Sequence, residues 1–436
     1  MPTASIAPIS TTSANRAIAF IGRSLILGSF SLLAVYGLYL RARLTESEDG
    51  ATGGLIASIT AVALAAVLLA VGLVKRPRLD SSLIIWATLF FVCSVGFPAL
   101  SIVFLQVDPG IAGRLISEVI VCAAMFLCGY LILRLELASL TSIAMIVALS
   151  GIICGYFTLS DFLEVNTYIR RLEGFGAVNY VANVYAGCAL CCLYLVAKAL
   201  IRRNLAFAAT AAAGAIFAAL LVVLLGSRQA AAALVLTCGW FAFGALGPRV
   251  GGGMLVITLP VAVLSMLVLS QSVDTSILLQ RFEPTAISNA VTVRAMVFSG
   301  ALVGLEPTDL LIGRPDLYGA LNVESTNPHN IIISALRHFG VFTALSLTFS
   351  LIHLFFKGCT LGSRSIDANA LAFALLMFAV TIFYVMASGH ITRSFHFFLF
   401  WGIAVAVIQT QSEVARKLDT RRQGSARPQF HRPRPL

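Results

Sequence analysis

The sequence predicts an all-α polytopic membrane protein with about twelve transmembrane helices and one long polar loop. Of its 436 residues, 59% are hydrophobic and only 11% are charged, and the mean hydropathy is +0.93. A soluble chain of this length would carry about 25% charged residues. The apolar residues fall in long runs, and the one long polar interruption covers residues 272–329. The bilayer is therefore the main solvent of this chain.

The apolar runs set the expected domain organisation, because about twenty apolar residues cross a bilayer. The expected spans are residues 22–40, 51–74, 82–105, 115–133, 138–159, 179–200, 205–225, 229–246, 252–271, 330–356, 367–388 and 395–412. We expect a disordered segment over 1–21, nine spans over 22–271, the loop over 272–329, three spans over 330–412 and a basic tail over 413–436. The first run lacks a small-residue cleavage site, which predicts a retained signal anchor.

The Lys and Arg residues predict the orientation. With a cytoplasmic N-terminus, the cytoplasmic segments hold 19 of the 30 Lys and Arg residues and the external segments hold 10. The positive-inside rule therefore places both termini in the cytoplasm and the long loop outside. In the inner membrane of a bacterium, where we expect this protein, the outside is the periplasm. Because the cations lie at span ends and in the tail, the net charge of +11 does not predict nucleic-acid binding. The tail either sets orientation only or lies on anionic lipid.

The nine cysteines predict no disulfide framework, since eight of them lie within apolar runs. Cys188, Cys191 and Cys192 form a cluster that is open to two interpretations. The first is a metal site, and the second is helix packing by small polarizable side chains, which we favour.

Arg228 is the first candidate binding residue. It lies in Gly226-Ser227-Arg228-Gln229, between two apolar runs that leave almost no room for a loop. We expect a tight turn that places Arg228 at headgroup depth on the external face. There it either snorkels to any lipid phosphate or holds a pyrophosphate through two parallel hydrogen bonds.

The long loop predicts an interfacial helix. Residues 287–304 are mostly apolar, but Asn289 and Arg294 argue against another span. Such a helix would lie in the interface, with Ser288 or Asn289 as its N-cap. A purely amphipathic surface helix is the alternative. The following Gly313-Arg314-Pro315-Asp316 predicts a turn.

The tenth span begins at Pro328-His329-Asn330, and proline is favoured in the first turn of a helix. His329 is then at a helix start on the external face. A neutral histidine accepts a proton from an attacking hydroxyl, and a protonated one pairs with phosphate. A structural role is the alternative. Arg337 and His338 lie within the same run, and we expect a kink or half-helix ending near Gly340.

Two further external segments carry polar side chains suited to a sugar. Residues 160–178 include Arg171, and residues 389–394 include His390 and Arg393, with His396 just inside the last span. Ordinary solvated loops are the competing interpretation. The external face thus collects arginines and histidines, while the sequence lacks a carboxylate-rich metal cluster, a Gly-rich phosphate loop and a Ser/His/Asp set. This combination suits an anionic lipid-phosphate donor whose leaving group is stabilised by arginine.

The order of these motifs resembles the bacterial family of O-antigen ligases and O-antigen polymerases, which includes exopolysaccharide polymerases. A Ser227-Arg228 turn is followed by a long external loop with an Arg-bearing helix and the Gly313 turn. Pro328-His329-Asn330 then opens an apolar helix with Gly340 eleven residues beyond the histidine. The likeness covers residues 160–410, and the first five spans contribute only hydropathy.

The resemblance implies a multispanning, inverting glycosyltransferase of the GT-C kind that needs no metal or other cofactor. Its donor would be a glycan on undecaprenyl pyrophosphate, and its acceptor a lipid or a glycan, in lipopolysaccharide or exopolysaccharide biosynthesis. Membrane lipids and other polysaccharide assembly proteins would be its partners. Arg228 and Arg294 would hold the pyrophosphate, and His329 would act as base on the acceptor hydroxyl or orient it. Further substrate contacts would come from Asn330, Arg314, Arg171, His390 and Arg393.

This chain departs from the family pattern at two places. Phe298 is the nearest aromatic residue after the loop arginine, where the family often has tryptophan, and Gly313-Arg314-Pro315 replaces the usual Gly-x-Gly turn. Ligase and polymerase share the motifs, so both remain open. A flippase or transporter of a lipid-linked or anionic solute is the alternative function, and a scaffold in a secretion complex is a third.

Overall fold

The computed structural model confirms an all-α polytopic membrane protein. It describes residues 11–40, 48–75, 81–165, 178–244, 283–285, 288–289, 292, 295–296, 305–314, 330–362, 367–387 and 394–425. Within this part of the chain every regular element is a helix. His329, Arg294, Arg171, His390 and Arg393 lie outside the described residues.

The helices follow the apolar runs of the sequence. In chain order they are α1 (Thr11–Leu32), the π-helix η1 (Leu33–Leu40), α3 (Glu48–Lys75), α4 (Ser81–Phe104), α5 (Pro109–Arg134), α6 (Leu140–Val165), α7 (Val178–Ile201), α8 (Leu205–Leu224), α12 (Pro307–Ile312), α13 (Ile331–Gly362), α14 (Ala368–Ala387) and α15 (Phe395–Ser425). A further helix covers residues 228–244.

Nine of the described helices are long and apolar enough to cross a membrane, and each matches one of the twelve expected spans. The first expected span is built by α1 and η1, with a shorter apolar helix over Phe20–Tyr36. The eighth corresponds to the helix over residues 228–244. The ninth, 252–271, lies outside the described residues, so the number twelve stays a prediction.

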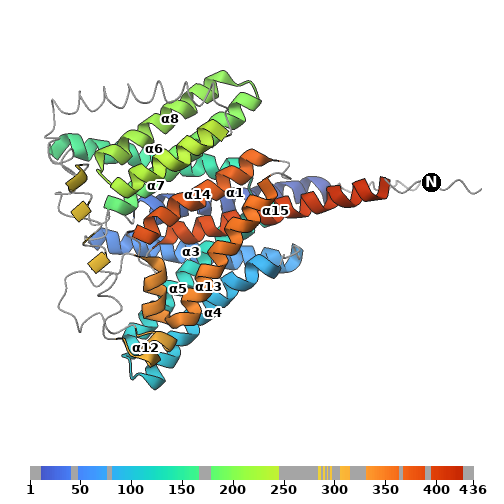
Figure 1. Cartoon of the computed structure of the whole chain (residues 1–436). Helices are drawn as coiled ribbons and strands as arrows, with labels where there is room; N and C mark the ends of the chain where they lie inside the picture. The colour runs from blue at the N-terminus through green and yellow to red at the C-terminus, as the bar shows by residue number, and fades with distance from the viewer. Residues whose placement is uncertain are drawn as a thin grey trace, which may run out of the picture.

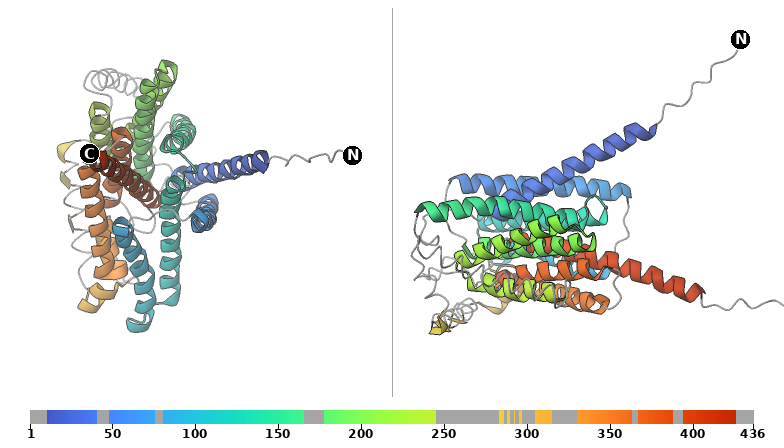
Figure 2. Two further views of the ribbon diagram at one scale, coloured as in Figure 1. Left: turned by 90° about the vertical axis from the view of Figure 1, so that its right-hand side faces the viewer. Right: turned by 90° about the horizontal axis from the view of Figure 1, so that it is seen from above.

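The helices form one bundle whose two faces differ in the ends they carry (Figures 1 and 2). The N-terminal end of α1 and the C-terminal end of α15 project from the same side, which we call the terminal face. The opposite side carries α12, and we call it the loop face. This arrangement agrees with an even number of crossings.

Ion pairs join the helices at the terminal face. Arg134 on α5 pairs with Glu413 on α15 at 2.6 Å, and Lys198 on α7 pairs with Asp367 just before α14 at 2.6 Å. On the same face, the Lys357 amine donates to the Ser82 hydroxyl at 3.1 Å. Each contact links segments far apart in the sequence, so these polar groups fix the order of the helices without entering the hydrocarbon layer.

Two glycines bring α5 and α15 into backbone contact. A Cβ atom added at Gly129 would overlap the backbone oxygen of Leu399, and one added at Gly402 would overlap that of Phe126. Small residues permit this close approach between membrane helices, where dispersion replaces the hydrophobic effect as the driving force. The pair forms the centre of the bundle, around the fully buried Trp401.

Substitution Gly402→Ala tests this contact. The new methyl group meets backbone rather than a movable side chain, so we expect a loss of about 1–3 kcal/mol in the free energy of unfolding. Thermal unfolding of the detergent-purified protein measures it. Gly96→Ala on α4 is the matched control, since nothing lies within 4 Å of its added Cβ. Equal melting temperatures for the two variants would contradict the backbone contact.

Cys359 tests the orientation of the faces. It is the one exposed cysteine of the nine and lies at the terminal-face end of α13. If the terminal face is cytoplasmic, a membrane-impermeant maleimide labels Cys359 only after spheroplasts are permeabilised. Gly113 lies near the loop-face end of α5. A Gly113→Cys variant, made in a Cys359→Ser background, should be labelled in intact spheroplasts. The reverse pattern would show the opposite orientation.

Candidate functional site

The break in α13 places Arg337 and His338 on the loop face. Gly340 has φ +80° within a helix that otherwise runs from Ile331 to Gly362. Residues 341–362 alone span about 33 Å at 1.5 Å per residue, which suffices to cross a bilayer core of about 30 Å. Residues 331–339 therefore precede the crossing. The kink expected near Gly340 is confirmed.

Aromatic contacts with α4 support this depth. The rings of Phe342 and Phe97 stack at 6.0 Å, and those of Phe349 and Trp86 lie 5.2 Å apart. Phe97 is seven residues from Phe104, where α4 ends. Since α4 and the second half of α13 run antiparallel, Gly340 lies near the loop-face end of α4.

The short helix α12 fits into the break of α13 through two glycines. Gly313 has φ +88°, and a Cβ atom there would overlap the backbone of His338. A Cβ atom at Gly340 would overlap the carbonyl of Leu311. The N–H of Arg314 donates to the Arg337 carbonyl at 2.7 Å. Only glycine accepts positive φ without strain, so this interlock requires glycine at both positions.

Arg314 has its charge balanced within this interlock. Its Nη1 lies 3.5 Å from Oδ2 of Asp309, whose residue is 1% exposed. The same carboxylate accepts the N–H of Glu306 at 3.0 Å and so caps α12. Pro315 and Asp316 of the predicted turn lie outside the described residues, and the pairing favours a structural role for Arg314 over substrate binding.

Asn330 fixes the start of α13. Its Oδ1 accepts the N–H groups of Ile332 and Ile333 at 2.9 and 3.1 Å, which makes it the N-cap. Its Nδ2 donates to the carbonyl of Met386 at 3.4 Å, near the end of α14. Asn330 therefore ties the loop-face ends of two helices together, and His329 is the preceding residue of the sequence.

Arg228 begins the helix over residues 228–244, directly after the end of α8 at Leu224. The tight turn is confirmed, with Gly226 at φ +58° and Ser227 fully buried. The rings of Phe241 and Tyr194 lie 6.3 Å apart, which packs this helix on α7. Phe241 follows Arg228 by 13 residues, and Tyr194 follows Tyr180 by 14, so Arg228 lies at the level of Tyr180 on the loop face.

Three aromatic side chains meet where α7, α14 and α15 reach the loop face. The His396 ring lies 4.5 Å from Tyr180 and 5.0 Å from Tyr384, and the two tyrosine rings lie 5.5 Å apart. Deeper in the bundle, Tyr194 stacks on Phe373 of α14 at 4.3 Å, so α7 contacts both α14 and the helix over residues 228–244. Sequence reasoning noted the position of His396 but gave it no role.

The loop-face ends of five helices are therefore held in one group. Arg228, Asn330 and His396 lie in the first turns of three of them, and α7 and α14 join these three. A helix start carries the positive end of the helix dipole, which favours anions. The group can therefore bind a negatively charged ligand at the membrane surface.

Several described residues in the first half of the long loop are in helical conformation. Pro284, Thr285 and Asn289 are in helical conformation, and the Thr292 hydroxyl donates to the Ser288 carbonyl at 3.2 Å. The expected N-cap at Ser288 or Asn289 is wrong, because both residues are themselves in helical conformation.

The cysteine cluster matches the packing interpretation. The Cys188 thiol contacts the Ala148 carbonyl at 3.5 Å, and the Cys191 sulfur lies 4.0 Å from that of Met377. Among the described residues, no group of three or more His, Cys, Asp or Glu side chains is placed to hold a metal ion.

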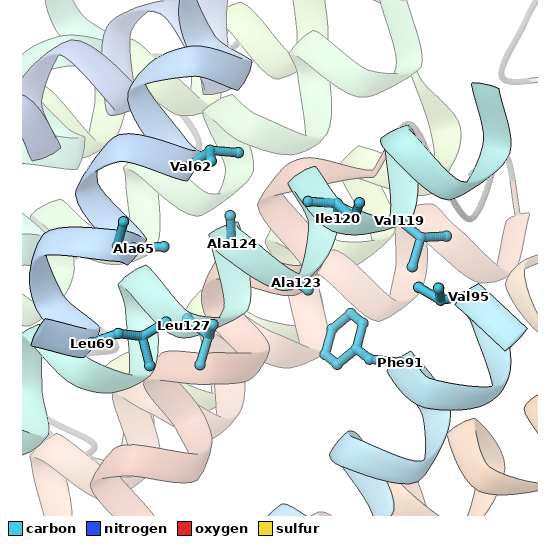
Figure 3. Close-up of a pocket in the computed structure, with 11 residues that line it drawn as sticks. Val62, Ala65, Leu69, Phe91, Val95, Val119, Ile120, Ala123, Ala124 and Leu127 are labelled. Carbon is cyan, nitrogen blue, oxygen red and sulfur yellow. The ribbon is translucent and has the colours of Figure 1, made fainter. Parts of the chain in front are cut away.

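A cavity of about 270 Å³ lies elsewhere, at mid-membrane between α3, α4 and α5 (Figure 3). Its lining is aliphatic apart from Phe91, and Val62 and Ile120 at its edge are 42% and 48% exposed. This cavity opens toward the lipid and offers space for hydrocarbon, with no group for chemistry.

Comparisons with known proteins leave the family open. No protein-family model matches the chain, and no curated protein matches it significantly.

Asn330→Ala tests the tie between α13 and α14. Loss of the cap costs about 0.5–2 kcal/mol, and loss of the bond to Met386 adds to it, as thermal unfolding should show. Asn330→Asp keeps the cap acceptor and should lie between the wild type and the alanine variant. Asn204→Ala is the control, because Asn204 caps α8 through the Phe207 N–H at 3.1 Å. A smaller loss for Asn330→Ala than for Asn204→Ala would contradict the added interhelical bond.

Proposed function

We propose that the chain is a membrane glycosyltransferase that transfers or polymerises a glycan from undecaprenyl pyrophosphate, as an O-antigen ligase or polysaccharide polymerase. The observation that carries the proposal is the group of helix starts on the loop face, with Arg228 and Asn330 both in it. The face would be the periplasmic face of a bacterial inner membrane. Seven Lys and Arg residues from Arg416 to Arg434, in the last turns of α15 and in the tail that follows it, support a cytoplasmic terminal face.

Arg228 would bind the donor pyrophosphate together with Arg294. Its guanidinium lies in the first turn of a helix, so its own charge adds to the positive end of the helix dipole. The arginine charge and the helix dipole would both stabilise the negative charge that develops on the leaving pyrophosphate. Two arginines would thus do what a divalent cation does in other phosphate-releasing enzymes.

His329 would act on the acceptor. Its ring would accept the proton of an acceptor hydroxyl while that oxygen attacks the anomeric carbon of the donor sugar. The bond between this carbon and the pyrophosphate oxygen breaks, and the pyrophosphate leaves with the electron pair. Attack from the side opposite the leaving group inverts the configuration. Asn330 supports this role, because its cap and its bond to Met386 fix the backbone directly after His329.

The depth of Arg337 and His338 supports transfer over transport. Transporters of anionic solutes carry charged residues and broken helices near the membrane midplane. Here the break at Gly340 lies at the loop-face end of a full crossing, and α12 fills it. The polar residues of α13 therefore lie beside the face where a lipid-linked glycan would be bound.

Complementation of a deletion strain tests the proposal. Arg228→Ala, Arg294→Ala and His329→Ala should each abolish transfer, by at least about a hundredfold for loss of a base or of charge stabilisation. Undecaprenyl pyrophosphate-linked glycan should then accumulate on the periplasmic side, as measured by mass spectrometry. Gel analysis of the surface polysaccharide distinguishes a ligase, which leaves the lipid acceptor bare, from a polymerase, which leaves single repeats.

Arg202→Ala is the matched control, an exposed arginine at the terminal-face end of α7. It should complement fully, and immunoblots of membranes should show equal amounts of every variant. Full complementation by the three site variants would contradict the proposed site. Accumulation of the glycan on the cytoplasmic side would indicate a flippase.

A further inference from the structure

The side chain of His396 is enclosed in the first turn of α15. It is 1% exposed and lies between the rings of Tyr180 on α7 and Tyr384 on α14. Within the described part of the chain, neither of its ring nitrogens has a hydrogen-bond partner. A neutral imidazole carries one donor and one acceptor, so two polar groups are buried here without compensation.

Asn183 adds a third polar atom to the same strip. It is fully buried on α7, one turn beyond Tyr180 and on the same side of the helix. Its Nδ2 donates to the Val380 carbonyl of α14 at 2.9 Å. Its Oδ1 has no hydrogen-bond partner among the described residues. Three unsatisfied polar atoms thus line the contact between α7, α14 and α15.

A packing role alone does not account for His396. His338 is equally buried, at 1% exposure, and its Nδ1 lies 2.8 Å from the Ser334 carbonyl. One ring nitrogen of His338 thus has a hydrogen-bond partner, whereas neither ring nitrogen of His396 has one among the described residues. A buried polar group without a partner costs its full desolvation free energy, and phenylalanine would fill the same space without that cost. A polar ligand would supply the hydrogen-bond partners that the His396 ring lacks.

We propose that His396 and Asn183, together with Tyr180 and Tyr384, bind hydroxyl groups of the glycan acceptor. This inference rests on the proposed function and assigns its second substrate. The unsatisfied atoms are one donor and two acceptors, and neighbouring sugar hydroxyls supply both donors and an acceptor. The tyrosine rings offer apolar faces to the C–H groups of a sugar ring.

The place of this subsite matches the place of the proposed reaction. Tyr384 contacts His396, and Met386, two residues further along α14, accepts a hydrogen bond from Asn330. An acceptor held at His396 therefore lies beside the start of α13. Because His396 is almost fully enclosed, binding requires a local movement of the surrounding side chains, and the new hydrogen bonds compensate for it.

Kinetics of the full-length protein in nanodiscs test the subsite. The donor probe is the undecaprenyl pyrophosphate-linked glycan purified from the deletion strain, and the acceptor probe is the lipid and glycan fraction of the same strain. His396→Phe should raise the acceptor concentration for half-maximal rate about tenfold or more, as expected for lost hydrogen bonds. The half-saturating donor concentration should change less than about twofold. His396→Gln should restore part of the acceptor affinity.

Thermal unfolding separates this role from a structural one. His396→Phe should melt at the wild-type temperature or above it, because it removes buried polar atoms that have no partner. His353→Phe is the matched control, a half-buried histidine on α13 thirteen residues beyond Gly340. It should leave both substrate dependences unchanged.

Three results would overturn the inference. His396→Phe could show wild-type acceptor dependence while Arg228→Ala is inactive, in which case the subsite fails and the proposed function stands. His396→Phe could melt well below the wild type and lose donor and acceptor affinity alike, which would make the histidine structural. Full transfer by Arg228→Ala would remove the proposed function, and the acceptor subsite with it.

Discussion

The whole structure depends on the absence of hydrogen-bond partners in the hydrocarbon core of the bilayer. Every polar group must find a partner within the protein or lie at one of the two faces. At the terminal face, pairs such as Arg134 with Glu413 satisfy each other and hold the helices in order. At the loop face, Arg228, Asn330 and His396 lie in the first turns of helices. The polar groups of the terminal face therefore close the bundle, whereas those of the loop face would be presented to the proposed ligand.

Hydropathy predicts the helices well because it measures what the bilayer selects. Nine expected spans match described helices, and the short Gly226–Arg228 turn and the break at Gly340 follow from glycine beside charged residues. The N-cap at Ser288 or Asn289 was wrong, since both residues are themselves in helical conformation. An apolar segment without a strong boundary residue predicts that a helix is present, but it does not predict the residue at which the helix begins. The fit of α12 into the break of α13 could not be predicted either. It is a contact between backbone atoms, which the side-chain pattern of the sequence does not reveal.

The candidate site was predicted in part. Arg228 and Asn330 stand out in the sequence because each is a polar residue at the edge of an apolar run. His396 and Asn183 do not, because each lies within such a run. Their importance comes from contacts such as Asn183 with Val380, 197 residues apart. Such contacts depend on which helices are neighbours in space, and hydropathy gives no information on that order.

The glycine contact between α5 and α15 has a mechanical consequence. Two helices whose backbones touch cannot slide or rotate against each other without breaking close packing along the contact. The two helices therefore move as one rigid unit, and His396 lies at the loop-face end of that unit. If the protein binds a long glycan as proposed, the movement that admits it must occur in the helices around this pair. The acceptor subsite would then be half fixed, on α15, and half movable, on α7 and α14.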